Sequence, residues 1–164
     1  MSETILVTGA SAGFGQAICR RLVADGYRVI GSARRIDKLQ ALQEELGEAF
    51  YPLQMDVTDL SQVDHALASL PKAWERVDVL VNNAGLALGL APAYEAEVAD
   101  WLTMIQTNII GLTYLTRKIL PQMVERNDGY IINLGSTAGT VPYPGANVYG
   151  ASKAFVKQFS LNLR

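Results

Sequence analysis

The stretch "TILVTGASAGFG", residues 4–15, joins a short apolar run to a glycine-rich turn. Residues 4–8 have the β-branched, apolar character of a buried strand. Glycines at positions 9, 13 and 15 allow a tight turn and a close approach of one backbone to another. A helix is expected to begin near Phe14, so the stretch predicts a strand, a turn and a helix in immediate succession.

The same alternation continues along the chain. Further strands are expected at 27–33, 49–55, 77–82 and 130–136, all buried. Helices are expected at 15–26, 36–47, 59–70 and 98–127, and a last one from near Tyr149. Gly26 and Gly47 are expected to end the first two helices. Strict alternation implies right-handed βαβ units, so we predict a single α/β domain over residues 1–164, built on a doubly wound parallel sheet.

Composition narrows the class of partner. The 164 residues are 49% hydrophobic and 18% charged, with a net charge of −2 and no run of like charges, so nucleic acid and anionic membrane are not expected partners. The longest uncharged stretch, 129–152, contains prolines and glycines and cannot span a membrane. No secretory signal opens the chain, which favours the cytoplasm. The single Cys19 and single His65 predict no disulfide and no metal site; Cys19 is expected to pack as a small apolar residue and His65 to be solvated.

The glycine-rich turn is suited to a dinucleotide. The start of a helix presents unpaired N–H groups and the positive end of its dipole, which together bind a pyrophosphate. The residues expected to contact it are Gly9, Ser11, Ala12, Gly13, Phe14 and Gly15. A purely structural turn is the alternative, because this glycine spacing departs from the commoner G-x-G-x-x-G.

The end of the second strand indicates which dinucleotide. Sites for NAD usually place a carboxylate there to hold the ribose 2′-hydroxyl. This chain instead has Arg34 and Arg35, whose guanidinium groups suit a 2′-phosphate. The cofactor is therefore predicted to be NADP(H). The alternative is a pair of solvated arginines that open a helix.

Polar residues follow the next two strands. Asp56, with Val57 as apolar cover, is expected to meet the adenine, or else Asp56 caps the following helix; Thr58 and Asp59 are also candidate caps. "NNAG", residues 82–85, includes the expected cofactor contacts Asn83, Ala84 and Gly85. Two asparagines at the end of a buried strand suggest a hydrogen-bonding framework beside the cofactor, because a buried amide needs its partners.

The stretch "YGASKAF", residues 149–155, supplies a reacting group. Tyrosine alone is a poor base because phenols ionise near pH ~10. Lys153 lies four residues after Tyr149 and therefore on the same helix face, where its ammonium favours the phenolate. Tyr149 is the expected acid and base in a hydride transfer to or from a nicotinamide. Ser136, expected to end the fifth strand, would hydrogen-bond the substrate oxygen, and Asn108 is a helix residue that a polar role would explain.

Together "TGASAGFG", "NNAG", Asn108, Ser136 and "YGASK" resemble the short-chain dehydrogenase/reductase family, in order and separation, over essentially the whole chain. The resemblance implies a Rossmann-type sheet with strand order 3-2-1-4-5, whose later strands are missing from this chain. It also implies a tetrad of Asn108, Ser136, Tyr149 and Lys153. Ser136 and Tyr149 would bind substrate, Lys153 would also bind the nicotinamide ribose, and Asn108 would hold a water that links Lys153 to solvent. It also implies a homo-oligomer, a dimer or a tetramer, built on long helices.

Residues 81–93 and 131–164 are similar to those of the bacterial NADP-dependent 3-hydroxy acid dehydrogenases. That group oxidises L-allo-threonine, serine and 3-hydroxypropanoate and reduces malonic semialdehyde, so a short hydroxy acid or semialdehyde is the implied substrate. Family members are longer, with two further strands, and the chain is interpreted as an N-terminal portion with an open fifth strand. The alternatives are a non-catalytic NADP-binding module and a family member that acts on another small carbonyl or alcohol.

Overall fold

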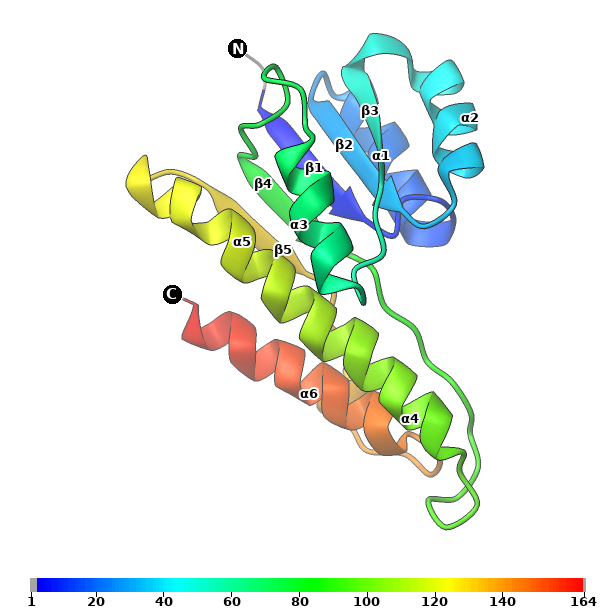
Figure 1. Cartoon of the computed structure of the whole chain (residues 1–164). Helices are drawn as coiled ribbons and strands as arrows, with labels where there is room; N and C mark the ends of the chain where they lie inside the picture. Colours follow the sequence, from blue (N-terminus) through cyan, green and yellow to red (C-terminus); the bar gives the residue numbers. More distant parts are fainter. Residues whose placement is uncertain (1–2, 164) are drawn as a thin grey trace.

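A computed structural model describes residues 3–163 and contains one parallel sheet with helices on both faces (Figure 1). The strand order is β3-β2-β1-β4-β5, which confirms the predicted topology. Ile5 in the central strand pairs with Val29 on one side and with Val79 on the other. The strands are β1 (Thr4–Thr8), β2 (Arg28–Ala33), β3 (Phe50–Gln54), β4 (Val79–Asn82) and β5 (Tyr130–Asn133).

Local sequence signals account for the ends of the first two helices and for the beginning of the third. Gly26 and Gly47 follow the first two helices with φ of 89° and 70°, as their predicted role as stop signals demands. Of the candidate caps for the third helix, Asp59 is the one used: its carboxylate accepts a bond from the Gln62 N–H at 3.0 Å. The α-helices are α1 (Gly13–Ala24), α2 (Ile36–Leu46), α3 (Leu60–Ala68), α4 (Val98–Ile105), α5 (Leu112–Glu125) and α6 (Asn147–Asn162). Three short segments complete the order: the 3₁₀ turns η1 (Gly47–Ala49) and η3 (Thr137–Gly139) and the π-helical η2 (Gln106–Gly111).

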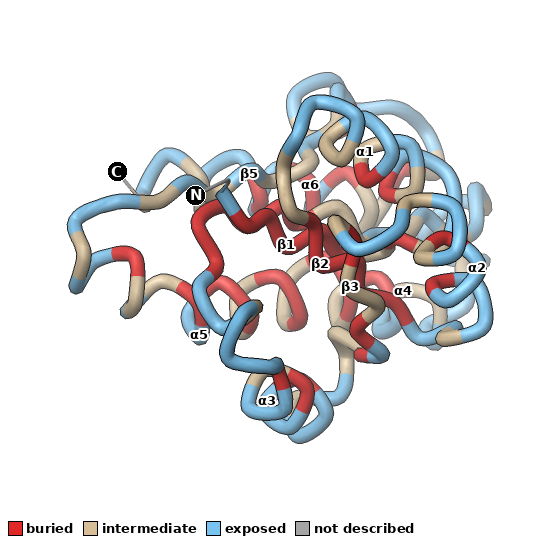
Figure 2. The backbone as a smooth tube through the Cα atoms, turned by 90° about the horizontal axis from the view of Figure 1, so that it is seen from above, coloured by how far each residue is buried: buried red, intermediate tan, exposed pale blue. Residues whose placement is uncertain are grey.

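The sheet is covered by different helices on its two faces, and its central strands are buried (Figure 2). On one face α3 and α5 pack on the sheet, with Leu6, Leu80 and Leu115 fully buried. On the other face α1 and α2 do so, with Val29, Leu39 and Cys19. Cys19 therefore packs as predicted, and burial raises the pKa of its thiol to about 12.

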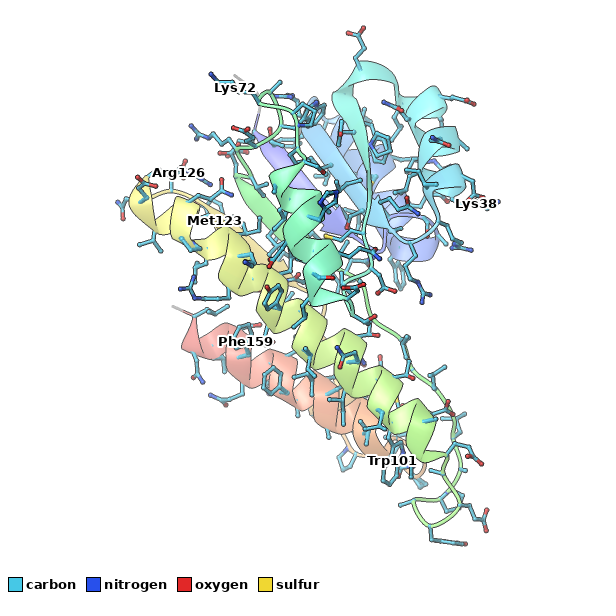
Figure 3. All side chains as sticks on the ribbon, viewed as in Figure 1. Lys38, Lys72, Trp101, Met123, Arg126 and Phe159 are labelled. Carbon is cyan, nitrogen blue, oxygen red and sulfur yellow. The ribbon has the colours of Figure 1, made fainter. Side chains whose placement is uncertain are left out.

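The long helix expected at 98–127 is α4, η2 and α5 in one continuous run. The backbone stays right-handed helical at Ile105, Gln106, Gly111 and Leu112, where the three segments join. Trp101, near the beginning of this run, lies at one end of the molecule (Figure 3). Among residues 3–163, no helix combines the length and the apolar character needed to cross a bilayer.

Strand β5, at one edge of the sheet, is shorter and more exposed than predicted. Strand β5 stops at Asn133 and is not buried: Tyr130 is 66% exposed and Ile132 51% exposed. Helices α1 and α2 pack on β1, β2 and β3, which leaves these two side chains in water. The prediction that Ser136 ends the fifth strand is therefore wrong. Ser136 lies in the loop beyond β5 and precedes η3.

Candidate functional site

A cavity of about 490 Å³ opens at the carboxyl ends of the strands. All five strand ends contribute to its wall, which includes the point between β1 and β4 where the strand order reverses. This is where ligands bind in open α/β sheets. Most of the expected ligand-binding residues line it: Gly9, Ser11, Ala12, Phe14, Gly15, Arg34, Arg35, Asp56, Val57, Asn83, Ala84, Gly85, Tyr149 and Lys153. Those outside its wall are Gly13, Asn108 and Ser136.

The glycine-rich turn is shaped by close backbone approaches. A Cβ at Gly15 would collide with the carbonyl oxygen of Gly9 and would lie 2.5 Å from the amide nitrogen of Asn83. Gly13 begins α1 with φ of 55° and has open space around it. Ala12, which precedes the helix, provides no side-chain cap, so the first-turn N–H groups stay available to a ligand. A free helix N-terminus at the cavity wall fits an anion such as pyrophosphate.

Thr8, which was not among the predicted site residues, connects this turn to the "NNAG" segment. Its Oγ1 accepts bonds from the N–H groups of Asn83 at 3.0 Å and Ala84 at 2.9 Å. The Asn83 amide in turn donates to the Thr8 carbonyl at 2.7 Å. The available signal was a threonine at the end of a buried strand directly before a glycine, where a hydroxyl needs a partner.

Asn82, the first of the two asparagines, bonds to other elements than the glycine-rich turn. Its buried amide donates to Thr116 Oγ1 at 3.0 Å and to Asn133 Oδ1 at 2.8 Å. Asn133 donates onward to Ser160 Oγ at 2.8 Å. These bonds join α5, β4, β5 and α6 and lie outside the cavity wall, so of the two asparagines only Asn83 bonds to the glycine-rich turn.

The charges around the cavity favour an anionic ligand. Arg34 and Arg35 are exposed at the end of β2, and the guanidinium of Arg35 donates to Ser11 Oγ at 3.0 Å. Among the residues that line the cavity, Arg34, Arg35 and Lys153 are cationic and only Asp56 is acidic. The Asp56 carboxylate accepts two bonds from Thr58, at 2.9 Å from its N–H and at 2.7 Å from its hydroxyl. Asp56 therefore does not cap α3, and that alternative is wrong.

Tyr149 and Lys153 meet on one face of α6, as their spacing predicts. The Lys153 Nζ lies 6.0 Å from the centre of the Tyr149 ring and donates to the Leu134 carbonyl at 2.8 Å. Lys153 is only 8% exposed, and burial lowers its pKa. Two groups suited to proton transfer thus lie together at the cavity wall.

Asn108 is buried in η2 and holds three bonds. Its Oδ1 accepts from the Leu86 N–H at 3.0 Å, and its Nδ2 donates to the Leu86 carbonyl at 2.9 Å and to Ser152 Oγ at 3.1 Å. Ser152, which was not among the predicted site residues, donates to the Tyr149 carbonyl at 2.7 Å. Both amide N–H groups of Asn108 are therefore occupied by protein, and the side chain connects the cavity segment at Leu86 with the helix that carries Tyr149.

Ser136 precedes η3, and its Oγ accepts a bond from the Ala138 N–H at 3.2 Å. The side chain is half-buried, and the neighbouring Leu134 and Gly135 line the cavity. The structure thus brings Ser136 next to the cavity wall, on a loop that packs against α6.

Known proteins share this sequence and fold. The chain is 61% identical over 160 residues to the NADP-dependent 3-hydroxy acid dehydrogenase YdfG of Salmonella typhi, a match that covers 98% of this chain and 64% of that protein. It is 52% identical over 164 residues to the serine 3-dehydrogenase of Agrobacterium fabrum, with 100% of this chain and 66% of that protein covered. The structure matches the closed form of a serine dehydrogenase complexed with NADP⁺, with a TM-score of 0.97, 59% identity, and 98% and 65% of the two chains covered.

The chain thus spans about 64% of the length of the YdfG proteins that it matches. The family model described as short chain dehydrogenase matches residues 3–164, which include the glycine-rich turn, the "NNAG" segment and the Tyr149–Lys153 pair. On this evidence, the chain belongs to the short chain dehydrogenase family.

Proposed function

We propose that this chain carries the cofactor site and the reacting groups of an NADP(H)-dependent oxidoreductase that acts on short 3-hydroxy acids or their semialdehydes. One observation carries the proposal: the glycine-rich turn, the arginine pair and the Tyr149–Lys153 pair all line the same 490 Å³ cavity. The names of the 3-hydroxy acid and serine dehydrogenase relatives support the substrate class.

The residues around the cavity fit a dinucleotide phosphate. The free N-terminus of α1 and the glycine turn would hold the pyrophosphate, and Arg34 and Arg35 the 2′-phosphate. Asp56 and Val57 would meet the adenine, while Asn83, Ala84 and Gly85 would flank the cofactor. When bound, the nicotinamide supplies the hydride in reduction and accepts it in oxidation.

The chain's own residues would move the proton. Tyr149 would take the hydroxyl proton of an alcohol in oxidation and return it to the carbonyl oxygen in reduction. Lys153, held at the Leu134 carbonyl, would favour the ionised tyrosine and bind the ribose. Ser136 would hydrogen-bond the reacting oxygen, and Asn108 would hold the Leu86 segment and α6 in register.

The assembly and setting of the protein are also proposed. A homo-oligomer, a dimer or a tetramer, is supported by the apolar side chains that α4 presents to solvent: Val98 is 62% exposed and Leu102 is 61% exposed. A cytoplasmic, single-domain enzyme with a small-molecule substrate agrees with the composition and the lone, buried Cys19.

A second candidate function is an NADP-binding module without turnover. The observation that favours it is the position of Ser136, whose side chain does not line the cavity and is bonded within its own turn. In that case the cavity would bind the dinucleotide, and no substrate oxygen would meet the Ser136 hydroxyl.

One experiment separates the two candidates. The protein, expressed from its complete reading frame, is titrated with NADPH and then assayed for NADPH absorbance change with malonic semialdehyde, and for NADP⁺ reduction with serine and L-allo-threonine. The proposal expects turnover that Tyr149→Phe reduces by ~10³-fold or more while NADPH binding persists, because only the proton-transfer group is lost. Tyr130→Phe, at an exposed tyrosine of β5, is the matched control and keeps full activity. Binding without turnover on any substrate would favour the second candidate.

A further inference from the structure

The loop that carries Ser136 is held against Lys153 at both ends. At one end, the Leu134 carbonyl accepts the Lys153 Nζ at 2.8 Å. At the other end, Gly139 of η3 lies directly on the backbone of α6: a Cβ added to Gly139 would lie 2.6 Å from the carbonyl carbon of Lys153 and 2.7 Å from the N–H nitrogen of Ala154. These are backbone atoms of a helix interior and cannot move aside as a flexible side chain could.

Ser136 is bonded to the same turn that Gly139 presses onto the helix. The Gly139 N–H donates to the Ser136 carbonyl at 3.1 Å, and the Ala138 N–H donates to Ser136 Oγ at 3.2 Å. A movement of η3 away from α6 would therefore carry the backbone and the hydroxyl of Ser136 with it.

The helix contributes a second glycine to this contact. A Cβ on Gly150 would lie 3.0 Å from the Ala138 carbonyl oxygen, on the turn of α6 between Tyr149 and Lys153. The contact between η3 and α6 is thus a backbone-to-backbone approach with glycine on both sides, next to the two residues of the proton-transfer pair.

We propose that Gly139 is a positioning residue for the reaction: by letting η3 touch the backbone of α6 at Lys153, it fixes where the Ser136 hydroxyl stands relative to Tyr149. The inference rests on the proposed function for its effect on rate, while the displacement that it expects is a property of the structure alone.

The expected displacements follow from the contacts. Ordinary packing begins near 3.4 Å, so alanine at Gly139 requires η3 to move by about 0.8 Å, and alanine at Gly150 by about 0.4 Å. A misplacement of about 1 Å at a reacting group can lower the rate by ~10²-fold. Gly139→Ala should therefore lower kcat by ~10²-fold and Gly150→Ala by less, with the NADPH Kd within about twofold of the wild-type value because neither glycine lines the cavity.

The test measures kcat, substrate KM, NADPH Kd and a crystal structure for Gly139→Ala and Gly150→Ala, each also in a Ser136→Ala background. Gly26→Ala is the control: this glycine has φ of 89° and open space around it, so alanine there strains the backbone at the far end of α1 without moving η3. The control should lose stability but keep kcat. In the Ser136→Ala background the two glycine variants should lower kcat by no more than about threefold further, because their effect passes through the missing hydroxyl.

Three results would overturn the proposal: an unchanged kcat in folded Gly139→Ala, an equal loss of kcat in the Ser136→Ala background, or a crystal structure in which Ser136 keeps its wild-type position relative to Tyr149. If Gly139→Ala does not fold, the same measurements on Gly150→Ala test the proposal. Alanine at position 150 favours the helix, and its Cβ overlaps η3 less than one at position 139 overlaps α6. If the wild-type protein turns over no substrate, the proposed function fails, and the displacement of Ser136 in the crystal structures still tests the positioning role.

Discussion

Replacing Thr8 by valine should weaken the junction between the glycine-rich turn and the "NNAG" segment. Thr8 is buried at 1% exposure, and valine matches its shape while removing the hydroxyl. The N–H groups of Asn83 and Ala84 then lose the acceptor that they share. Because Ala84 and the neighbouring Gly9 both line the cavity, the change should also reduce NADPH binding.

The magnitude follows from the two lost bonds. Each N–H left without a partner costs about 1 to 2 kcal/mol, with the lower part of the usual range chosen because both residues are only half-buried. The added methyl group returns about 0.8 kcal/mol through apolar burial. The free energy of unfolding should therefore fall by about 1 to 3 kcal/mol, a large share of the 5 to 15 kcal/mol that is usual for a domain.

Urea denaturation of the wild-type protein, Thr8→Val and Thr8→Ser measures this loss. Serine keeps the acceptor oxygen and removes only the methyl group, so it isolates the packing contribution. Amide hydrogen exchange at Asn83 and Ala84 should speed up in the valine variant and stay near the wild-type rate in the serine variant. The reasoning is refuted if valine is no more destabilising than serine, or if exchange at these two amides does not change.

Three further outcomes are expected. Arg34→Glu, alone or with Arg35→Glu, should weaken NADPH binding by roughly tenfold or more while NADH binding changes little, since only the 2′-phosphate loses its charged partner; fluorescence titration checks this, and an equal loss for both cofactors would contradict it. Burial lowers the pKa of Lys153, so the folded state binds fewer protons than the unfolded state between that lowered pKa and the ordinary value of about 10.4. The free energy of unfolding of the wild-type protein should therefore rise as pH increases through this window. Urea denaturation at a series of pH values measures this rise, which Lys153→Met should lack. The Cys19 thiol, fully buried and with its pKa raised to about 12, should not react with a thiol reagent at pH 8 until urea unfolds the chain, and rapid labelling of the folded protein would show that α1 opens.

Local patterns in the sequence were sufficient for the doubly wound architecture and for much of the cavity. Apolar runs and helical spacing report which face of each element is buried, and alternation of strand and helix restricts the order of a parallel sheet. Residues that follow successive strands then meet at one edge, so Gly9, Arg34, Asp56 and Asn83 could be placed together without tertiary information. The pair Tyr149 and Lys153 needed only the helical repeat.

The choice between neighbouring candidates needed the structure. Asp56, Thr58 and Asp59 all have suitable oxygens for the cap of α3, and only the path of the backbone gives the position to Asp59. The sequence of β5 is as apolar as that of a buried strand, yet two of its side chains lie in water because the helices on that face cover other strands. The composition of a strand does not determine which helices pack on it.

By itself, then, the sequence determined the alternation of strands and helices, the edge of the sheet where the cavity lies and the face shared by Tyr149 and Lys153, because these follow from patterns within a few residues. The strand order came from the resemblance to a known family. Only the tertiary structure decided that Thr8 supports the "NNAG" segment, that Asn108 joins Leu86 to Ser152, and that Gly139 touches α6. Those partners are separated by 14 to 76 residues, and which donor meets which acceptor depends on how packed elements cross, a quantity that no local pattern encodes.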